Sequence, residues 1–67
     1  MSPLALECKN LVQAAGGRLA YRELYAQIAP ENRLRLANAL KEARKEGALD
    51  QDVKMVEGVV VQTLFIP

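Results

Sequence analysis

The sequence predicts a small α+β domain in which three helices are followed by a C-terminal β-hairpin. Apolar residues recur with the period of a helix as far as Gly47, and after Gly47 they alternate with polar residues as they do in strands. The chain of 67 residues is long enough for one domain, residues 1–67, and too short to enclose a deep active site. Three helices followed by a hairpin is the element order of a winged-helix fold, which usually serves as a binding module.

The first helix is expected to begin at Ser2 and to end at Gly16-Gly17. Ser2 can cap the helix, and Pro3 suits its first position because the missing N–H of proline would be unbonded there anyway. The segment Arg18–Ala20 is too short to be more than a bridge or a small first strand. The stripe expected to be buried consists of Leu4, Cys8, Leu11, Val12 and Ala15.

Two further helices are expected between Tyr21 and Gly47. The second runs from Tyr21 through Ile28, and Pro30 separates it from a third helix that begins near Pro30 or Asn32 and stops at Gly47. The side chains expected to point inward from the second helix are Leu24, Tyr25 and Ile28. The buried stripe expected for the third consists of Leu36, Ala39, Leu40 and Ala43, flanked by Leu34 and Ala37.

The C-terminal segment predicts a hairpin that turns at Glu57-Gly58. If the loop consists of those two residues, one face carries Leu49, Val53, Met55, Val60, Leu64 and Ile66 and packs on the helices. The opposite face then carries Val56, Val59, Val61 and Phe65. Glutamate is not a favoured first residue of a type I′ turn, so a one-residue slip or a longer wing stays open.

The opposite face of the hairpin is the first candidate site, because no element of the chain is expected to cover it. Contiguous exposed apolar surface usually marks an interface. We therefore predict a protein interface formed by Val56, Val59, Val61 and Phe65. The alternatives are that the first helix covers this face, that the register differs, or that another part of a longer parent protein covers it. The last strand is also expected to be a free edge of the sheet, through which two copies could pair as a homodimer.

The outer face of the third helix is the second candidate site. Side chains on such a helix reach phosphates or guanine edges in nucleic-acid-binding winged helices. The residues concerned are Arg35, Asn38, Lys41, Arg44 and Lys45. A formal net charge of +1, with Glu42 and Glu46 in the same stripe, disfavours a nucleic-acid partner. Nucleic-acid binding is therefore the alternative function, and a solvated charged face is the simpler interpretation.

Nothing in the sequence indicates catalysis, and we expect neither an enzyme nor a metal or other cofactor. The chain has no His and one cysteine, Cys8, which falls on the buried stripe of the first helix. Asp50, Asp52 and Glu57 lack the glycine pattern of a calcium loop. The N-terminal residues do not read as a signal peptide, and no apolar run approaches ~18 residues. We expect an intracellular protein, cytoplasmic or nuclear, with no membrane segment.

Two segments of the chain, Gly17–Tyr25 and Ala39–Leu49, resemble the costars family of winged-helix-like domains. The shared features are a Gly-Arg-aliphatic start, an aromatic and a Leu-aromatic pair, and a helix that ends in a basic pair and glycine before an aliphatic strand. Met55–Leu64 is similar to the final hairpin of that family. The likeness spans Gly17 to Ile66, but the first helix and the hairpin are shorter here and the acidic residues between the last strands are missing. The resemblance implies a non-catalytic domain linked to actin-cytoskeleton regulation, with an actin-associated protein partner and no functional residue carried over.

Overall fold

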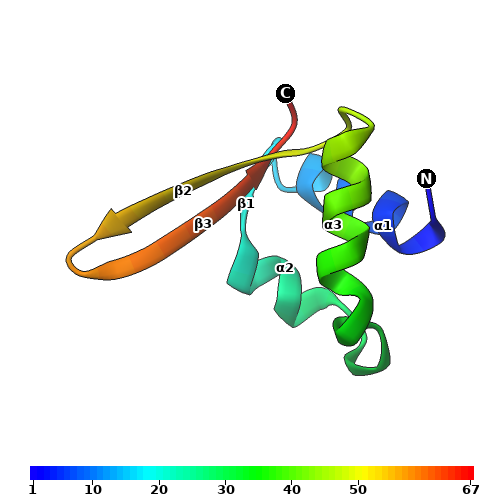
Figure 1. The fold of residues 1–67 in the computed structure, drawn as a ribbon, viewed down its shortest axis with the longest axis horizontal. Coiled ribbons are helices and arrows are strands. Elements are labelled where there is room, and N and C mark those ends of the chain that lie inside the picture. The colour runs from blue at the N-terminus through cyan, green and yellow to red at the C-terminus, as the bar shows by residue number, and fades with distance from the viewer.

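The computed structural model describes all 67 residues and contains three α-helices and a three-stranded antiparallel sheet (Figure 1). The α+β class predicted from the sequence is therefore confirmed. The elements in chain order are α1 (Pro3–Ala14), β1 (Arg18–Ala20), α2 (Tyr21–Gln27), the 3₁₀ helix η1 (Pro30–Arg35), α3 (Leu36–Lys45), β2 (Asp50–Val56) and β3 (Val59–Phe65).

The last strand is the middle strand of the sheet, which has the order β1-β3-β2. The short segment after the first helix forms β1 and pairs with the end of β3, from Arg18 opposite Phe65 to Ala20 opposite Thr63. The prediction that the last strand is a free edge is therefore wrong for its C-terminal part. The free edge is β2 along its whole length, together with the part of β3 from Val59 to Gln62 on the side of β1.

The first helix begins where the sequence predicts. The Ser2 hydroxyl accepts a hydrogen bond of 3.2 Å from the Ala5 amide, and Pro3 occupies the first helical position. The helix ends at Ala14, and two glycines in the left-handed region, with φ of 91° and 94°, redirect the chain into β1. Ala15 follows the last turn and is exposed, against the prediction. The buried side chains of α1 are Ala5, Cys8 and Val12, with Leu4 and Leu11 partly buried.

The second and third helices differ from the prediction at two points. Tyr25 is 40% exposed rather than inward, and the guanidinium of Arg33 lies 4.6 Å from the centre of its ring. The third helix begins at Leu36, because the preceding residues form η1, in which the Asn32 amide donates to the Ala29 carbonyl at 2.8 Å. Leu34 lies on this segment and is 95% exposed, so it does not flank the buried stripe.

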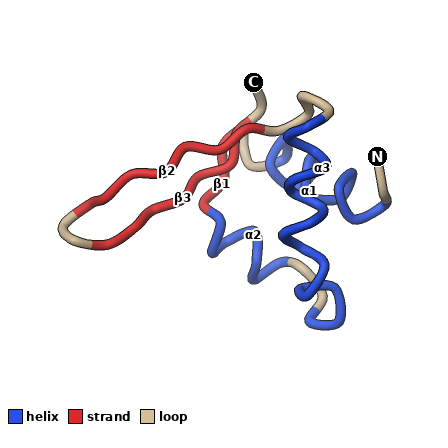
Figure 2. Tube along the Cα trace, in the orientation of Figure 1, coloured by secondary structure: helices blue, strands red, loops and turns tan.

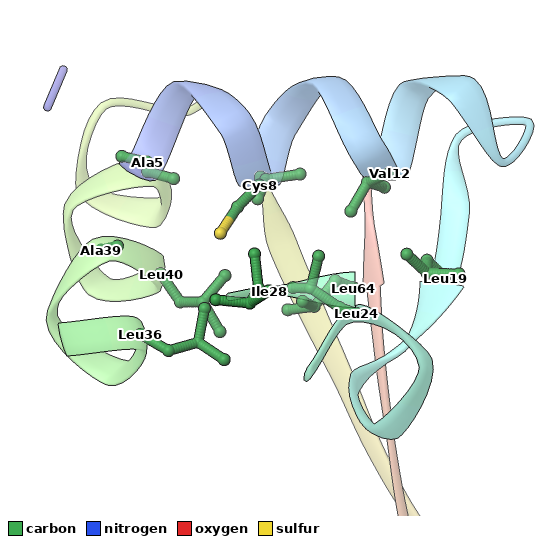
Figure 3. Close-up of a cluster of buried hydrophobic side chains, with 12 residues drawn as sticks. Ala5, Cys8, Val12, Leu19, Leu24, Ile28, Leu36, Ala39, Leu40 and Leu64 are labelled. Atoms are coloured by element: carbon green, nitrogen blue, oxygen red, sulfur yellow. The ribbon is translucent and has the colours of Figure 1, made fainter. Parts of the chain in front are cut away.

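The buried side chains form a single hydrophobic cluster at the junction of the helices with the base of the sheet (Figure 3). The four predicted core residues of the third helix, Leu36, Ala39, Leu40 and Ala43, are all buried. Leu64 supplies the buried residue of β3, and Leu49 precedes β2 and is also buried. The base of the hairpin is thereby anchored to the helices.

The hairpin turns at Glu57-Gly58, as predicted, with Val56 directly opposite Val59. Glu57 has φ of 52° and Gly58 has φ of 79°, and two successive positive φ values define a type I′ turn. The alternatives of a slipped register or a longer wing are therefore wrong. The left-handed conformation costs a non-glycine residue about 1–2 kcal/mol. The paired strands on either side of the turn hold Glu57 in it.

The outer half of the hairpin extends away from the helices, along the longest axis of the molecule (Figures 1 and 2). The alternation predicted correctly which side chains share a face, but the expectation that this whole face packs on the helices is wrong. Val53, Met55 and Val60 are exposed by 55%, 68% and 63%. Strands rise by about 3.3 Å per residue, so the seven-residue strands β2 and β3 extend past the helices that pack against their base.

Candidate protein interface on the hairpin

The outer hairpin, defined as residues 53–61, presents apolar side chains on both faces. Val56 and Val59 are directly opposite each other and are 48% and 62% exposed. Met55 and Val60 form the next pair toward the base and point to the other face. The apolar members of the outer hairpin are Val53, Met55, Val56, Val59, Val60 and Val61. This set is contiguous along both strands; five of its members are 48–68% exposed, and Val61 is half-buried beside the start of α2.

Three of the four residues predicted for the protein interface belong to the outer hairpin, and Phe65 does not. Val56, Val59 and Val61 lie on one face of the hairpin, as predicted. Phe65 lies on the same face but at the base, opposite Arg18 and Asp50, and the Arg18 guanidinium is 5.2 Å from the centre of its ring. The arginine partly covers this ring, so Phe65 is a half-buried residue at the margin of the candidate interface.

The residues that sequence reasoning missed are Val53, Met55 and Val60, which it placed against the helices. Their alternation with polar residues is the same as that of buried residues, so the pattern alone gives no signal of their exposure. The lengths of the elements do give one. A seven-residue strand is longer than the short second helix can cover, since a helix rises by only about 1.5 Å per residue.

A groove of about 340 Å³ lies along the open part of β3, between the hairpin and the start of α2. The Ile66 amide donates to the Gly17 carbonyl at 2.9 Å, so even-numbered residues of β3 direct their backbone groups toward the side of β1. Because β1 ends at Ala20, the backbone of Val60 and Gln62 is left without a strand partner in this groove. The groove extends the apolar surface of the outer hairpin to the helical part of the molecule.

The five residues of the predicted nucleic-acid site are all exposed, four of them on α3 and Arg35 directly before it. Lys41, Arg44 and Lys45 are exposed on α3, and none of them takes part in an ion pair. Arg35 and Asn38 also line a polar hollow of about 470 Å³ between α1 and α3, which contains Glu7 and Glu42 as well. The Arg35 guanidinium donates to the side chain of Asn32.

Glu42 on α3 and Glu46 directly after it lie close to the N-terminus of the chain. The α-amino group of Met1 lies 3.9 Å from the Glu42 carboxylate and 3.6 Å from that of Glu46, and the Ser2 amide donates to Glu42. Both carboxylates are therefore partly neutralised on the flank of α3 that packs beside α1.

Cys8 is a packing residue of the core. Its side chain points from α1 into the cluster between the helices, and it has no exposed surface (Figure 3). Burial, helped by the negative charge of Glu7, raises the pKa of the thiol to about 11. The thiol is therefore protonated at neutral pH. The structure contains no group of three His, Cys, Asp or Glu side chains placed to hold a metal ion, and none of its helices combines the length and apolar content needed to cross a membrane.

Between about pH 9 and pH 11, the free energy of unfolding is expected to fall less in Cys8→Ala than in the wild type. The folded thiol keeps its proton up to about pH 11, whereas the reference pKa is 9.0. Above pH 9 the unfolded thiol loses its proton first. The contribution of Cys8 to the free energy of unfolding is therefore complete below pH 9 and is lost as the pH rises to about 11. A shift of this size corresponds to at most about 2–3 kcal/mol. Urea unfolding at about pH 8 and about pH 11 measures it for both proteins. Equal losses in the wild type and in Cys8→Ala would contradict the assignment.

Comparison of the chain with family models, with curated proteins and with solved structures gives no match. The resemblance to the costars family therefore stays a prediction. The chain has two candidate binding surfaces, the outer hairpin and the basic part of α3.

Proposed function

We propose that this chain is a non-catalytic, winged-helix-like module that binds another protein through the outer hairpin. One observation carries the proposal: the outer hairpin extends beyond the helices with apolar side chains exposed on both faces. The order of the elements and the sheet order β1-β3-β2 support the winged-helix description, in which β2 and β3 form the wing. The resemblance over Gly17 to Ile66 supports an actin-associated partner.

The free energies of burial and of association together require a partner that covers most of the outer hairpin. Complete burial of one valine or methionine side chain contributes about 1.5–3 kcal/mol. Association itself costs about 4–15 kcal/mol in lost translational and rotational freedom. Burial of the Val56–Val59 pair alone would leave little net affinity. These side chains are 48–68% exposed, so a partner that also covers Val53, Met55 and Val60 would bring the gain into the range of that cost.

The charges on the wing favour a protein over a nucleic acid. Lys54 is the only cation of the outer hairpin, and its ammonium lies 3.6 Å from the Asp52 carboxylate. Most contacts of proteins to DNA are made to phosphate and sugar, chiefly by arginine, lysine and polar groups. A wing composed mainly of valine offers few such groups.

The second candidate function is nucleic-acid binding by the outer face of α3. Lys41, Arg44 and Lys45 support it, because they are exposed and free of carboxylate partners. A cluster of Lys and Arg along one helix is the electrostatic footprint of such proteins. Asn38 is exposed one turn before Lys41 on the same helix, whereas Arg35 precedes the helix and its guanidinium donates to Asn32.

Parallel captures with the full chain distinguish these two functions. In one, proteins retained from a lysate are identified, purified and titrated against the chain. In the other, random duplex DNA is titrated at about 50 and about 200 mM salt, between which three phosphate contacts would lower the affinity about 40-fold. Binding of a purified protein with little salt dependence, and no binding of DNA at the lower salt, supports the proposed function. Salt-sensitive DNA binding without a protein partner would reject it.

A further inference from the structure

We propose that the free edge of β2 pairs with β2 of a second copy of this chain, in antiparallel orientation about a two-fold axis through Val53. The pairing would join two three-stranded sheets into one continuous sheet. The inference rests on the proposed function, because it names a second copy of the chain as a partner of the outer hairpin.

The outer edge of β2 carries backbone groups that are free to pair with a further strand. In a two-residue hairpin the residues that flank the turn form a hydrogen-bonded pair, so Val56 and the other even-numbered residues of β2 direct their N–H and C=O groups to β3. Gln51, Val53 and Met55 consequently direct theirs outward, where the sheet has no further strand. An unpaired row of this kind is a template for pairing with another chain.

The register follows from the length of the strand. Val53 is the middle residue of β2, which runs from Asp50 to Val56, so a two-fold axis at this position pairs the whole strand with its copy. Val53 then lies opposite Val53 of the second copy, and Gln51 lies opposite Met55. All three are outward-directed, so the two copies exchange roughly six backbone hydrogen bonds.

The charges of β2 are complementary to their own copy in this register. The axis through Val53 places Lys54 of each copy directly opposite Asp52 of the other, so two oppositely charged pairs form at once. The register with its axis through Asp52 keeps two Lys54–Asp50 pairs, but it places Asp52 opposite Asp52 and pairs fewer residues of the strand. The register with its axis through Lys54 places Lys54 opposite Lys54. Like charges directly opposite each other destabilise an antiparallel pair, whereas opposite charges stabilise it. Full pairing and charge matching therefore select the same register.

The side chains concerned are accessible. The side chain of Lys54 is 61% exposed and that of Asp52 is 39% exposed. Asp52 also lies 3.7 Å from the Arg18 guanidinium, so each new pair would extend an existing network of charges. Val53 and Met55, which are exposed in the single chain, would pack along the junction on one face of the joined sheet.

The area of the contact indicates a weak, concentration-dependent dimer. Stable interfaces bury about 1,200–2,000 Å² in total, more than two seven-residue strands bury edge to edge. We therefore expect a dissociation constant between about 10 µM and 1 mM. The open part of β3 offers only Val60 and Gln62 to a further strand, and nothing in its groove specifies an occupant.

A charge-swap series measured by sedimentation equilibrium tests the pairing. The wild-type mass is expected to rise from 7.4 kDa toward twice that value as the concentration increases. Lys54→Asp and Asp52→Lys each place like charges opposite one another at two positions, and each should weaken association about tenfold or more. The double variant Asp52→Lys/Lys54→Asp restores opposite charges and should associate within about threefold of the wild type. Circular dichroism verifies that every variant is folded.

A second pair of variants tests the backbone contribution. Val53→Pro removes an N–H that points to the open edge and leaves the pairing with β3 intact, so it should abolish the dimer. Val53→Thr keeps the N–H and a similar shape, and should retain the dimer. A wild type that stays monomeric at all concentrations, a double variant as weak as the single ones, or dimerisation of Val53→Pro would each overturn the inference. A monomeric chain that still binds a captured protein would leave the proposed function standing, so the two proposals fail separately.

Discussion

Replacing Leu64 by alanine is expected to lower the free energy of unfolding by about 2–5 kcal/mol. Leu64 has no exposed surface and lies at the centre of the sheet, between Leu19 on β1 and Gln51 on β2. It is the only buried side chain of β3, and it joins the sheet to the helical core. Domains of this size rarely have more than about 3–5 kcal/mol of stability. The expected loss is therefore a large part of the stability of the domain, so the variant should unfold at a much lower urea concentration than the wild type.

The matched control for this prediction is Val60→Ala, on the same strand and the same face as Leu64. Val60 is 63% exposed, so its truncation removes little buried surface and should cost less than about 1 kcal/mol. Urea denaturation followed by circular dichroism measures both losses. Equal losses for the two substitutions would show that the outer hairpin packs as tightly as its base, contrary to the structure.

Replacing Val59 by aspartate is expected to abolish binding of the protein partner while leaving the fold almost unchanged. Val59 is 62% exposed beside the turn, so a carboxylate at this position stays solvated in the free chain. In the complex the same carboxylate would be buried without a partner, which costs several kcal/mol. A loss of affinity of about 100-fold or more is expected, and titration calorimetry with the purified partner measures it.

Arg44→Glu is the corresponding control on the other candidate surface. Arg44 is exposed on α3 and forms no ion pair, so reversing its charge should leave both the fold and the binding of the protein nearly intact. The opposite result, in which Arg44→Glu abolishes binding and Val59→Asp does not, would move the interface from the hairpin to the third helix.

The features that could be predicted from the sequence are those fixed by neighbouring residues. Ser2 and Pro3 mark the start of the first helix because a cap and a first-turn proline act within one turn. Glu57-Gly58 marks the turn of the hairpin because glycine readily adopts the positive φ that the second position of a type I′ turn requires. The buried stripe of the third helix follows from its periodicity in the same way.

The features that could not be predicted depend on contacts between distant residues. The position of β3 in the middle of the sheet depends on the pairing of Leu19 with Leu64, which lie 45 positions apart in the sequence. Tyr25 has the spacing of an inward residue, but its ring is exposed and carries Arg33 from the following segment. Local propensity carries no information about either contact.

The candidate interface was predicted in part for the same reason. Alternation identifies the side chains that share a face of a strand, and it placed Val56, Val59 and Val61 together correctly. Alternation does not show how far the helices extend beneath the other face, so by itself it does not reveal that Met55 and Val60 are exposed.

The most direct test of the binding surface is a map of backbone amide chemical shifts in the isotope-labelled chain as the purified partner is added. At dilutions where the chain is monomeric, the largest changes should lie in residues 53–61 of the outer hairpin, with little change in residues 41–45 of α3. Changes concentrated in α3, with the hairpin amides unaffected, would contradict the proposed function.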